Sequence, residues 1–312
     1  VASGGARGVT AQCLLALARE IQPKLILLGR TALEAEPASL QNVKDDAGLK
    51  KALLAEARAA GRTVTPAELG EVARKIQATR EVRGTLRARE DAGAQGRYVA
   101  ADVSDGRAVA AALEGVRREL GPIEGLVHGA GVIADKLIAE KTDEQFERVF
   151  ETKVGGLRAL LEATASDPLK AIAIFTSVAG RFGNVGQADY SMANETVSQV
   201  AAAEAVRRGG ACLVRSMAWG PWEGGMGTPS LKTQLEKAGV KLVSLEGGAA
   251  AFVAELRRGG SVEAILGEGP PRRSPEPVVP PSAGTVVLEV TVDRASAPFL
   301  TDHTIEDVPV VP

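Results

Sequence analysis

The sequence predicts an α/β fold in which helices cover both faces of a parallel sheet. Short apolar runs alternate along the chain with longer segments whose apolar residues recur at helical spacing. Strands that alternate with helices in this way form parallel sheets, and continuous apolar runs are typical of strands buried on both faces. We therefore expect a Rossmann-like, doubly wound sheet whose first strand ends at residues 1–3. The other strands are expected at 24–28, 97–101, 125–128, 172–176, 212–217 and 262–266.

Helices are expected between these strands, at about 10–21, 105–119, 143–165 and 188–208. Residues 34–96 depart from this pattern, because they are charged, rich in alanine and longer than an ordinary connection in an α/β unit. Thr65, Pro66 and Glu68 form a capping-box pattern with proline at the first helical position. We interpret 34–96 as a helical insertion after the second strand, with helices at 46–60 and 66–92, rather than as a disordered linker.

Composition excludes several classes of function. The 312 residues carry 37 lysines and arginines against 39 aspartates and glutamates, and the net charge of −2 gives no global attraction for nucleic acid or anionic membranes. No apolar run approaches the roughly 18–20 residues of a membrane-spanning helix, and no secretory signal opens the chain. Cys13 and Cys212 match no metal-binding spacing. We expect a cytoplasmic protein that binds no nucleic acid, membrane or metal.

The two ends of the sequence suggest a segment of a longer protein. The first strand has almost no residues before its glycine turn, although such a strand belongs in the middle of the sheet. Residues 267–284 are rich in proline and predict an extended linker. Alternating apolar residues within 285–312 then indicate a strand of a different sheet. We expect one domain at 1–266, with its insertion at about 34–96, then this linker and the beginning of a second domain.

The turn after the first strand has the composition of a nucleotide-binding loop. Glycines let the backbone approach a pyrophosphate, and the start of the following helix presents free N–H groups and a positive dipole. The spacing alone is equally compatible with a structural turn, and its place at the opening of the first strand–helix unit favours a dinucleotide. The predicted contacts are Gly4, Gly5, Ala6, Arg7, Gly8 and Val9.

Arg30 predicts which dinucleotide binds. It follows the second strand, where an acidic residue would pair with a ribose 2′-hydroxyl and an arginine suits a 2′-phosphate. Together with Arg7, it predicts NADPH; the alternative is a solvated surface charge. Asp102 and Val103 follow the third strand and are placed to touch the adenine, although Asp102 is equally suited to cap the next helix.

Several separated motifs resemble the short-chain dehydrogenase/reductase superfamily. They are Ser177, the run Tyr190-Ser191-Met192-Ala193-Asn194 and the earlier turn His128-Gly129-Ala130-Gly131. Most members of that superfamily carry a lysine four residues after the catalytic tyrosine. This chain has Asn194 at that position and a lysine at Lys153 on an earlier helix. The exchange resembles the ketoreductase domains of modular polyketide and fatty acid synthases.

The resemblance covers about residues 1–266. The run 219–226, from Trp219 to Met226, is similar to the tryptophan-rich turn that those domains carry after the sixth strand. The insertion at 34–96 most resembles the ketoreductase of bacterial polyunsaturated fatty acid synthases. The resemblance implies that the cofactor is also contacted by Gly129, Ala130, Gly131, Lys153, Tyr190, Gly220 and Pro221.

The chemistry of ketone reduction explains the predicted catalytic residues. A hydride donor must be joined by an acid that protonates the forming alkoxide. The phenol of Tyr190 is a poor acid near neutral pH, and the charge of Lys153, if the two are close, would lower its pKa. Ser177 ends a strand at the ligand-bearing edge of the sheet and is suited to hydrogen-bond the substrate carbonyl. Asn194, one helical turn after Tyr190, would hold a water or orient the lysine.

Taken singly, these four residues are ordinary members of a turn or a helix. Their order along the chain and their places at strand ends favour catalysis instead.

Substrate contacts and stereochemistry follow from the same resemblance. Ile133-Ala134-Asp135 stands where related ketoreductases carry Leu-Asp-Asp, and Phe182 replaces the tryptophan that marks the opposite class. Asp135 therefore predicts a 3R-hydroxyl product; the alternative is a helix cap. The substrate would enter beside Trp222 and the stretch 223–240, which includes Met226.

The end of the chain resembles the opening of a hotdog-fold dehydratase domain. Those domains carry His-x-x-x-Gly-x-x-x-x-Pro, with the histidine as catalytic base. His303 and Pro312 fit this spacing, and Asp307 stands at the glycine position. Because of that departure, no catalytic role is assigned to His303.

The resemblance implies an NADPH-dependent 3-oxoacyl-[acyl carrier protein] reductase domain within a polyketide or polyunsaturated fatty acid synthase. Its partners would be a phosphopantetheinyl acyl carrier protein and neighbouring ketosynthase and dehydratase domains. Two alternatives are a catalytically silent structural domain and a freestanding reductase of a small ketone. The complete catalytic set disfavours the first, and the cut ends and proline-rich linker disfavour the second.

Overall fold

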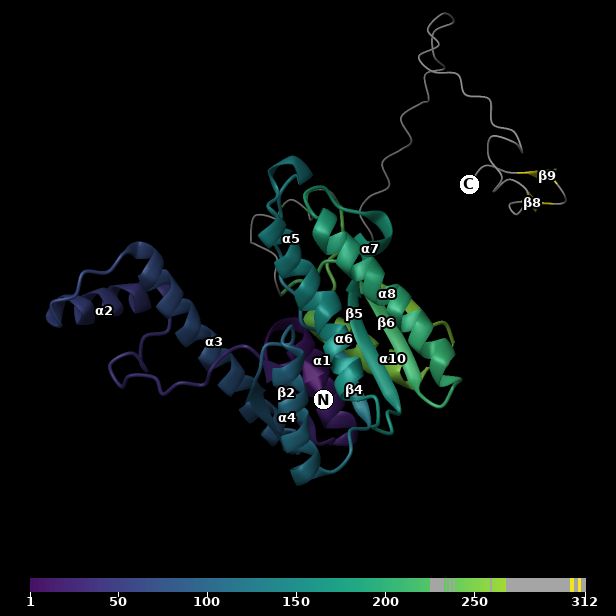
Figure 1. Ribbon diagram of the computed structural model, residues 1–312. Coiled ribbons are helices and arrows are strands. Elements are labelled where there is room, and N and C mark those ends of the chain that lie inside the picture. Colours follow the sequence, from purple (N-terminus) through teal and green to yellow (C-terminus); the bar gives the residue numbers. More distant parts are fainter. Residues whose placement is uncertain are drawn as a thin grey trace, which may run out of the picture. The chain divides into compact units, whose positions relative to one another are not determined.

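The computed structural model describes residues 1–224, 239–258 and 260–267, together with 233, 235, 237, 304–305 and 308–309. It divides into two compact units, Val1–Pro271 and Arg272–Pro312. In the first unit, seven parallel strands form one sheet in the order β3-β2-β1-β4-β5-β6-β7 (Figure 1). The Rossmann-like sheet predicted from the sequence is confirmed. Its strands are β1 (Ala2–Ser3), β2 (Leu25–Gly29), β3 (Gly96–Ala100), β4 (Gly125–His128), β5 (Ala171–Ser177), β6 (Leu213–Trp219) and β7 (Glu263–Leu266).

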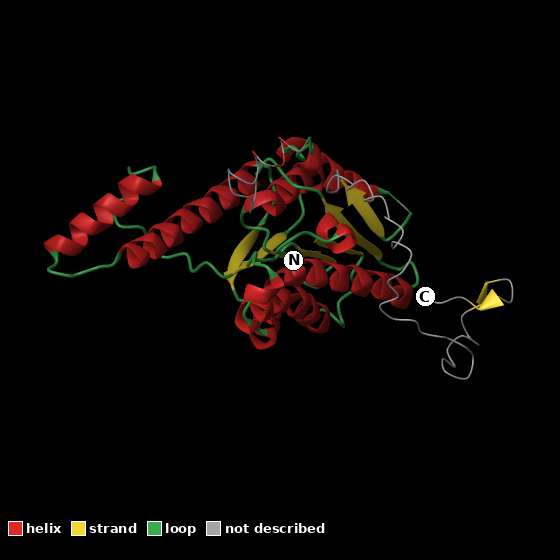
Figure 2. Ribbon diagram, turned by 90° about the horizontal axis from the view of Figure 1, so that it is seen from above, coloured by secondary structure: helices red, strands yellow, loops and turns green. Residues whose placement is uncertain are grey.

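Helices cover both faces of this sheet (Figure 2). Successive strand residues point to opposite faces. Ile26 and Leu28 pack with α4 (Gly106–Leu120), α6 (Gly156–Ala163) and α8 (Ala188–Arg208). Leu25 and Leu27 pack in a second core with α1 (Gly8–Ile21), α3 (Pro66–Asp91) and α10 (Leu245–Arg257). Two cores on two faces explain why the strands are apolar without alternation.

The strand order reverses at β1. Ser3 aligns with Leu28 of β2 on one side and with His128 of β4 on the other. The chain leaves β1 toward one face of the sheet, where α1 packs, and leaves β4 toward the other face, where α6 packs. A crevice therefore opens between these connections at the carboxyl ends of the strands.

The helix predicted at 143–165 is found in three pieces. These are α5 (Asp143–Phe150), a π-helical turn at Glu151–Gly155 and α6. In the π turn, the Gly156 N–H bonds to the carbonyl of Glu151, five residues earlier. Two short helices, η1 (Ile138–Glu140) and α7 (Val178–Phe182), and the longer α10 were not predicted.

The insertion is helical, as predicted, with α2 (Asp46–Ala59) and α3 lying at the predicted places. The Thr65 hydroxyl accepts from the Glu68 N–H and the Glu68 carboxylate accepts from the Thr65 N–H, which completes the capping box. Away from the sheet (Figure 1), α2 and α3 enclose a small separate cluster around Leu40, Leu49 and Ala73. At its other end α3 enters the main core through Val82. One helix therefore belongs to both the insertion and the domain.

Within the second unit, β8 (Thr304–Ile305) and β9 (Val308–Pro309) pair antiparallel. The predictions for 268–284, Met226, His303, Asp307 and Pro312 lie outside the described residues. Among the helices that the structure describes, none has the length and apolar character to cross a membrane. Cys13 and Cys212 are both buried and free.

Candidate active site

A cavity of about 1850 Å³ opens at the carboxyl ends of the strands. The turns after β1, β4 and β6 line it, together with the start of α8. Residues of α3 also line it, so the insertion contributes to its wall. Of the predicted residues, those that line it are Gly4, Ala6, Arg7, Gly8, Val9, Arg30, Val103, Gly129, Ala130, Gly131, Lys153, Ser177, Tyr190, Gly220, Pro221 and Trp222.

The two turns beside β1 pass each other in backbone contact. A Cβ on Gly4, whose φ is +69°, would lie 2.6 Å from the backbone nitrogen of Ala130. A Cβ on Gly129 would lie 2.5 Å from the Thr10 hydroxyl oxygen. Gly5 differs from the other predicted contacts, because it faces Leu14 of the core and does not line the cavity.

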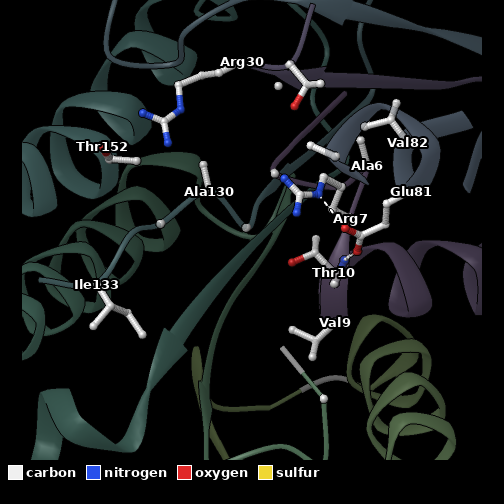
Figure 3. A pocket seen from close by; sticks show the side chains of 18 of the residues that line it. Ala6, Arg7, Val9, Thr10, Arg30, Glu81, Val82, Ala130, Ile133 and Thr152 are labelled. Atoms are coloured by element: carbon white, nitrogen blue, oxygen red, sulfur yellow. Dashed lines mark hydrogen bonds and ion pairs between the residues drawn. The ribbon is translucent and has the colours of Figure 1, made fainter. Parts of the chain in front are cut away.

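Arg7 and Arg30 differ in their partners. The Arg7 Nε lies 2.6 Å from a carboxylate oxygen of Glu81 on α3, and the other oxygen of Glu81 accepts the Gly8 N–H at 3.0 Å (Figure 3). A carboxylate thus sits at the start of α1, where the helix dipole favours negative charge. Arg30 is exposed and makes no ion pair with the described residues.

Asp102 and Val103 also lie in different environments. Val103 lines the cavity, whereas one Asp102 oxygen accepts from the Ser104 N–H at 3.0 Å and from its hydroxyl at 2.7 Å. Asp105, not Asp102, caps α4 by accepting from the N–H groups of Arg107 and Ala108. Asp102 therefore organises a turn of its own.

Ser177 and Tyr190 meet in the cavity. Ser177 ends β5, and its hydroxyl oxygen accepts the Ala179 N–H at 3.1 Å as α7 begins. That contact leaves the hydroxyl proton free to be donated. Tyr190 lies in the first turn of α8. Burial raises the pKa of its phenol, and hydrogen bonds with the side chains of Ser177 and Asn194 act in the opposite direction.

Lys153 lies in the π turn and is 6% exposed. Its ammonium donates to the carbonyl oxygen of Ala130 at 3.2 Å, and this is its hydrogen bond in the part of the chain that the structure describes. Burial lowers the pKa of this group to about 8. The pKa of the amine is therefore close to neutral pH, where the group can both gain and lose a proton.

Asn194 lies one helical turn after Tyr190 on α8 and does not line the cavity. Its amide nitrogen donates to the Tyr190 carbonyl at 2.8 Å, which fixes its orientation. Its Oδ1 is buried without a hydrogen-bond partner among the described residues.

The predicted substrate residues occupy different environments. Trp222 lines the cavity, and its ring packs against Trp219, with ring centroids 4.7 Å apart. Asp135 is exposed and accepts a hydrogen bond from Gln187 at 2.9 Å. Phe182 is 57% exposed and does not line the cavity.

Comparisons with known proteins identify the family. The KR domain family model matches residues 1–224. This chain belongs to the KR domain family. A polyunsaturated fatty acid synthase polypeptide of Thraustochytrium sp. is 36% identical over 320 residues, covering 100% of the chain and 11% of that protein.

Two further proteins agree with this assignment. Erythronolide synthase EryA2 of Saccharopolyspora erythraea is 35% identical over 174 residues, covering 55% of the chain and 5% of that protein. The crystal structure of an N-terminal ketoreductase from the macrolactin assembly line superposes with a TM-score of 0.63 at 26% identity, covering 86% of the chain and 44% of that structure. The KR domain is thus an oxidoreductase fold of the short-chain dehydrogenase/reductase type that spans a small part of its synthase relatives.

One buried ion pair of the KR domain was not predicted from the sequence. The Lys141 ammonium lies 2.8 Å from an Asp189 oxygen and also donates to the Ala134 carbonyl. The other Asp189 oxygen accepts the Tyr190 N–H at 2.9 Å. The pair fastens the loop after β4 to the start of α8, next to Tyr190. The only sequence signal for it is an aspartate directly before the tyrosine.

The buried charge of Lys153 predicts that this side chain lowers the stability of the folded protein. A pKa lowered from 10.5 to about 8 corresponds to a penalty of the order of 3 kcal/mol for holding the protonated amine in the folded chain. We expect Lys153→Met to raise the melting temperature of the cofactor-free protein at pH 7.

The difference should shrink as the pH rises from 8 to 10.5, because there the folded wild type releases its proton before the unfolded chain does. Lys170→Met serves as the control, since Lys170 is on the surface and its side chain is 71% exposed. Differential scanning calorimetry across this pH range measures both variants. A Lys153→Met protein that melts below the wild type at pH 7 would contradict the argument.

Proposed function

We propose that this KR domain reduces the 3-oxo group of an acyl thioester to a 3-hydroxyl with NADPH as cofactor. The observation that carries the proposal is the convergence of Ser177, Tyr190 and Lys153 on one cavity that also holds a glycine turn at a helix start. Membership of the KR domain family supports this reaction class.

The cavity fits a dinucleotide phosphate. Gly4 and Gly8 have positive φ and hold the turn open at the start of α1, where backbone N–H groups favour anions. Arg30 is available for a 2′-phosphate, whereas Arg7 would first have to leave Glu81. The turns at 129–131 and 220–221 would border the nicotinamide end. When bound, NADPH supplies the hydride that reduces the ketone carbon.

The residues of the chain supply the proton and hold the carbonyl. The Ser177 hydroxyl donates to the carbonyl oxygen and fixes it in the cavity. Tyr190 then gives its phenolic proton to that oxygen as the alkoxide forms. Because burial opposes the phenolate, the ionised state needs a nearby positive charge.

The Lys153 ammonium is that charge. It donates to the Ala130 carbonyl at the wall of the cavity that Tyr190 also lines, and its charge would stabilise the phenolate after proton transfer. The unpartnered Oδ1 of Asn194 is suited to accept from a water or from the lysine. We assign to these two residues the recovery of the Tyr190 proton.

The setting is proposed from the relatives, which are synthases far longer than this chain. The substrate would arrive as a thioester on the phosphopantetheine arm of an acyl carrier protein and enter beside Trp222. Ketosynthase and dehydratase domains would be its neighbours in a cytoplasmic synthase, and residues 285–312 would open a dehydratase-like hotdog domain. A dehydratase would remove the hydroxyl that the KR domain makes.

Tyr190→Phe tests whether Tyr190 is the proton donor. We expect kcat for reduction of a β-ketoacyl thioester surrogate to fall by about 10²–10⁴-fold, because the proton donor is lost. NADPH affinity, measured by the fluorescence of the bound cofactor, should change little. A variant that keeps full reductase activity would overturn the assignment. Wild-type protein that binds NADPH but reduces no thioester would favour a structural domain instead.

Arg30→Glu tests whether Arg30 sets the preference for NADPH over NADH. Replacing the 2′-phosphate partner by a carboxylate should lower the ratio of kcat/KM for NADPH to that for NADH by about 10–100-fold, since charge-assisted hydrogen bonds contribute about 1.5–3 kcal/mol. Arg158→Glu makes the same charge change at an exposed site on α6 and should leave the ratio unchanged. An unaltered ratio in Arg30→Glu would reject the role of Arg30.

The product of the wild-type protein tests the stereochemical proposal. Asp135 occupies the position that predicts the 3R class, and its carboxylate is oriented by Gln187. Chiral chromatography of the reduced thioester surrogate, after hydrolysis, should give the 3R alcohol in excess. An excess of the 3S alcohol would reject the proposal.

A further inference from the structure

Ser3 and His128 form a fully buried polar pair that the proposed reaction does not use. They end the neighbouring strands β1 and β4 and align with each other across the sheet. Both have an exposed fraction of 0%. The Ser3 hydroxyl lies 2.7 Å from Nδ1 of His128, and Nε2 of His128 lies 2.9 Å from the carbonyl oxygen of Lys153.

The chemistry of these contacts fixes the state of the ring. A carbonyl oxygen only accepts hydrogen bonds, so Nε2 of His128 carries the proton and donates it to Lys153. Nδ1 is then unprotonated and accepts from the Ser3 hydroxyl. Burial, with the Lys153 charge as a second cause, lowers the pKa of His128 to about 3. The ring therefore stays neutral near pH 7, and the hydrogen bonds run from Ser3 to His128 and from His128 to the Lys153 carbonyl.

The carbonyl that His128 holds belongs to the π turn. A single π turn within a helix changes the backbone pairing, and such turns are frequent at functional sites. Gly156 lets the end of this turn approach the sheet. A Cβ on Gly156 would lie 3.0 Å from the Val103 side chain and 3.2 Å from the His128 ring.

Strand β4 and its following turn thus hold Lys153 at both ends. His128 holds the backbone carbonyl, and Ala130, two residues later, accepts from the ammonium at 3.2 Å. A change in the position of the π turn would move the ammonium along the cavity wall.

We propose that His128, oriented by Ser3, is a positioning residue that locks the π turn and so fixes the Lys153 ammonium at the wall of the cavity that Tyr190 also lines. The inference rests on the proposed function for its effect on turnover, but its geometric content is independent of that function.

Two substitutions of His128 separate its two nitrogens. His128→Gln places an amide near the position of Nε2 and can still donate to the Lys153 carbonyl. His128→Asn places its amide near the position of Nδ1 and reaches only Ser3. We expect kcat to stay within about threefold of the wild type in His128→Gln and to fall by about 10²-fold in His128→Asn, with KM for the thioester little changed, because displacement of about 1 Å has that effect on catalysis.

A second measurement does not depend on turnover. Labelling of Lys153 by an amine-reactive reagent, followed by peptide mass spectrometry across pH, reports the protonation of its amine. The Lys153 charge acts on His128 of β4, and Tyr190 of α8 lines the same cavity; the imidazole and the phenol are both neutral near pH 7. In the wild type the labelling midpoint should lie near pH 8. In His128→Asn it should rise toward the ordinary lysine value of about 10.4, because the released amine reaches solvent.

The matched control is Thr164→Val. The buried Thr164 hydroxyl donates to the Leu160 carbonyl at 2.7 Å at the far end of α6, so the variant loses a hydrogen bond of the same kind away from the π turn. It should lower the melting temperature without moving kcat or the labelling midpoint. If His128→Asn does not fold, Ser3→Ala, which frees the ring to turn, should show the same changes to a smaller extent.

Two results would overturn the proposal. One is equal turnover of the Gln and Asn variants, and the other is a labelling midpoint that stays near pH 8 in folded His128→Asn or Ser3→Ala. A wild-type protein without reductase activity would reject the proposed function only, since the labelling experiment would still decide the role of His128.

Discussion

The architecture depends on two turns that pass each other backbone against backbone where the strand order reverses. Gly4 and Gly129 leave no room for a side chain at that crossing, because any Cβ would overlap the opposite turn or Thr10. Their contact sets the floor of the cavity. It also fixes the distance between α1, which offers N–H groups to an anion, and Ala130, which accepts from the Lys153 ammonium. Both halves of the site are therefore positioned by one steric constraint.

The separation of Lys153 from Tyr190 on different elements has a physical consequence. A lysine on α8 would share the rigid frame of the tyrosine, whereas Lys153 belongs to a π turn that packs beside α8 and needs supports of its own. Those supports are buried backbone carbonyls and a neutral ring rather than a carboxylate. An uncompensated ammonium lowers stability but keeps its full charge for a developing phenolate. Functional sites commonly depart from local rules of stability in this way.

The sheet and most helices were predictable, because a strand buried on both faces, such as β2, has to be apolar throughout. The helix α10 was not, since its first turn contains Gly247 and Gly248, which have low helix propensity. It forms because Phe252 is fully buried and Gly248 leaves room for the Trp222 ring. The π turn was hidden because the helical pattern of 143–163 runs through it. Glycine, lysine, serine and tyrosine positions could be assigned to the site from motifs, but the partners of His128 and Lys141 depend on tertiary contacts that no local pattern contains.

The helix α3 connects the outer part of the insertion to the wall of the cavity. Its 26 residues extend for about 39 Å without interruption. The outer part packs with α2, and the inner part carries Glu81 against Arg7 and the start of α1. A rod anchored at both ends transmits displacement along its length. A force applied to the outer helices of this domain would therefore reach the wall of the cavity at Glu81 and the start of α1.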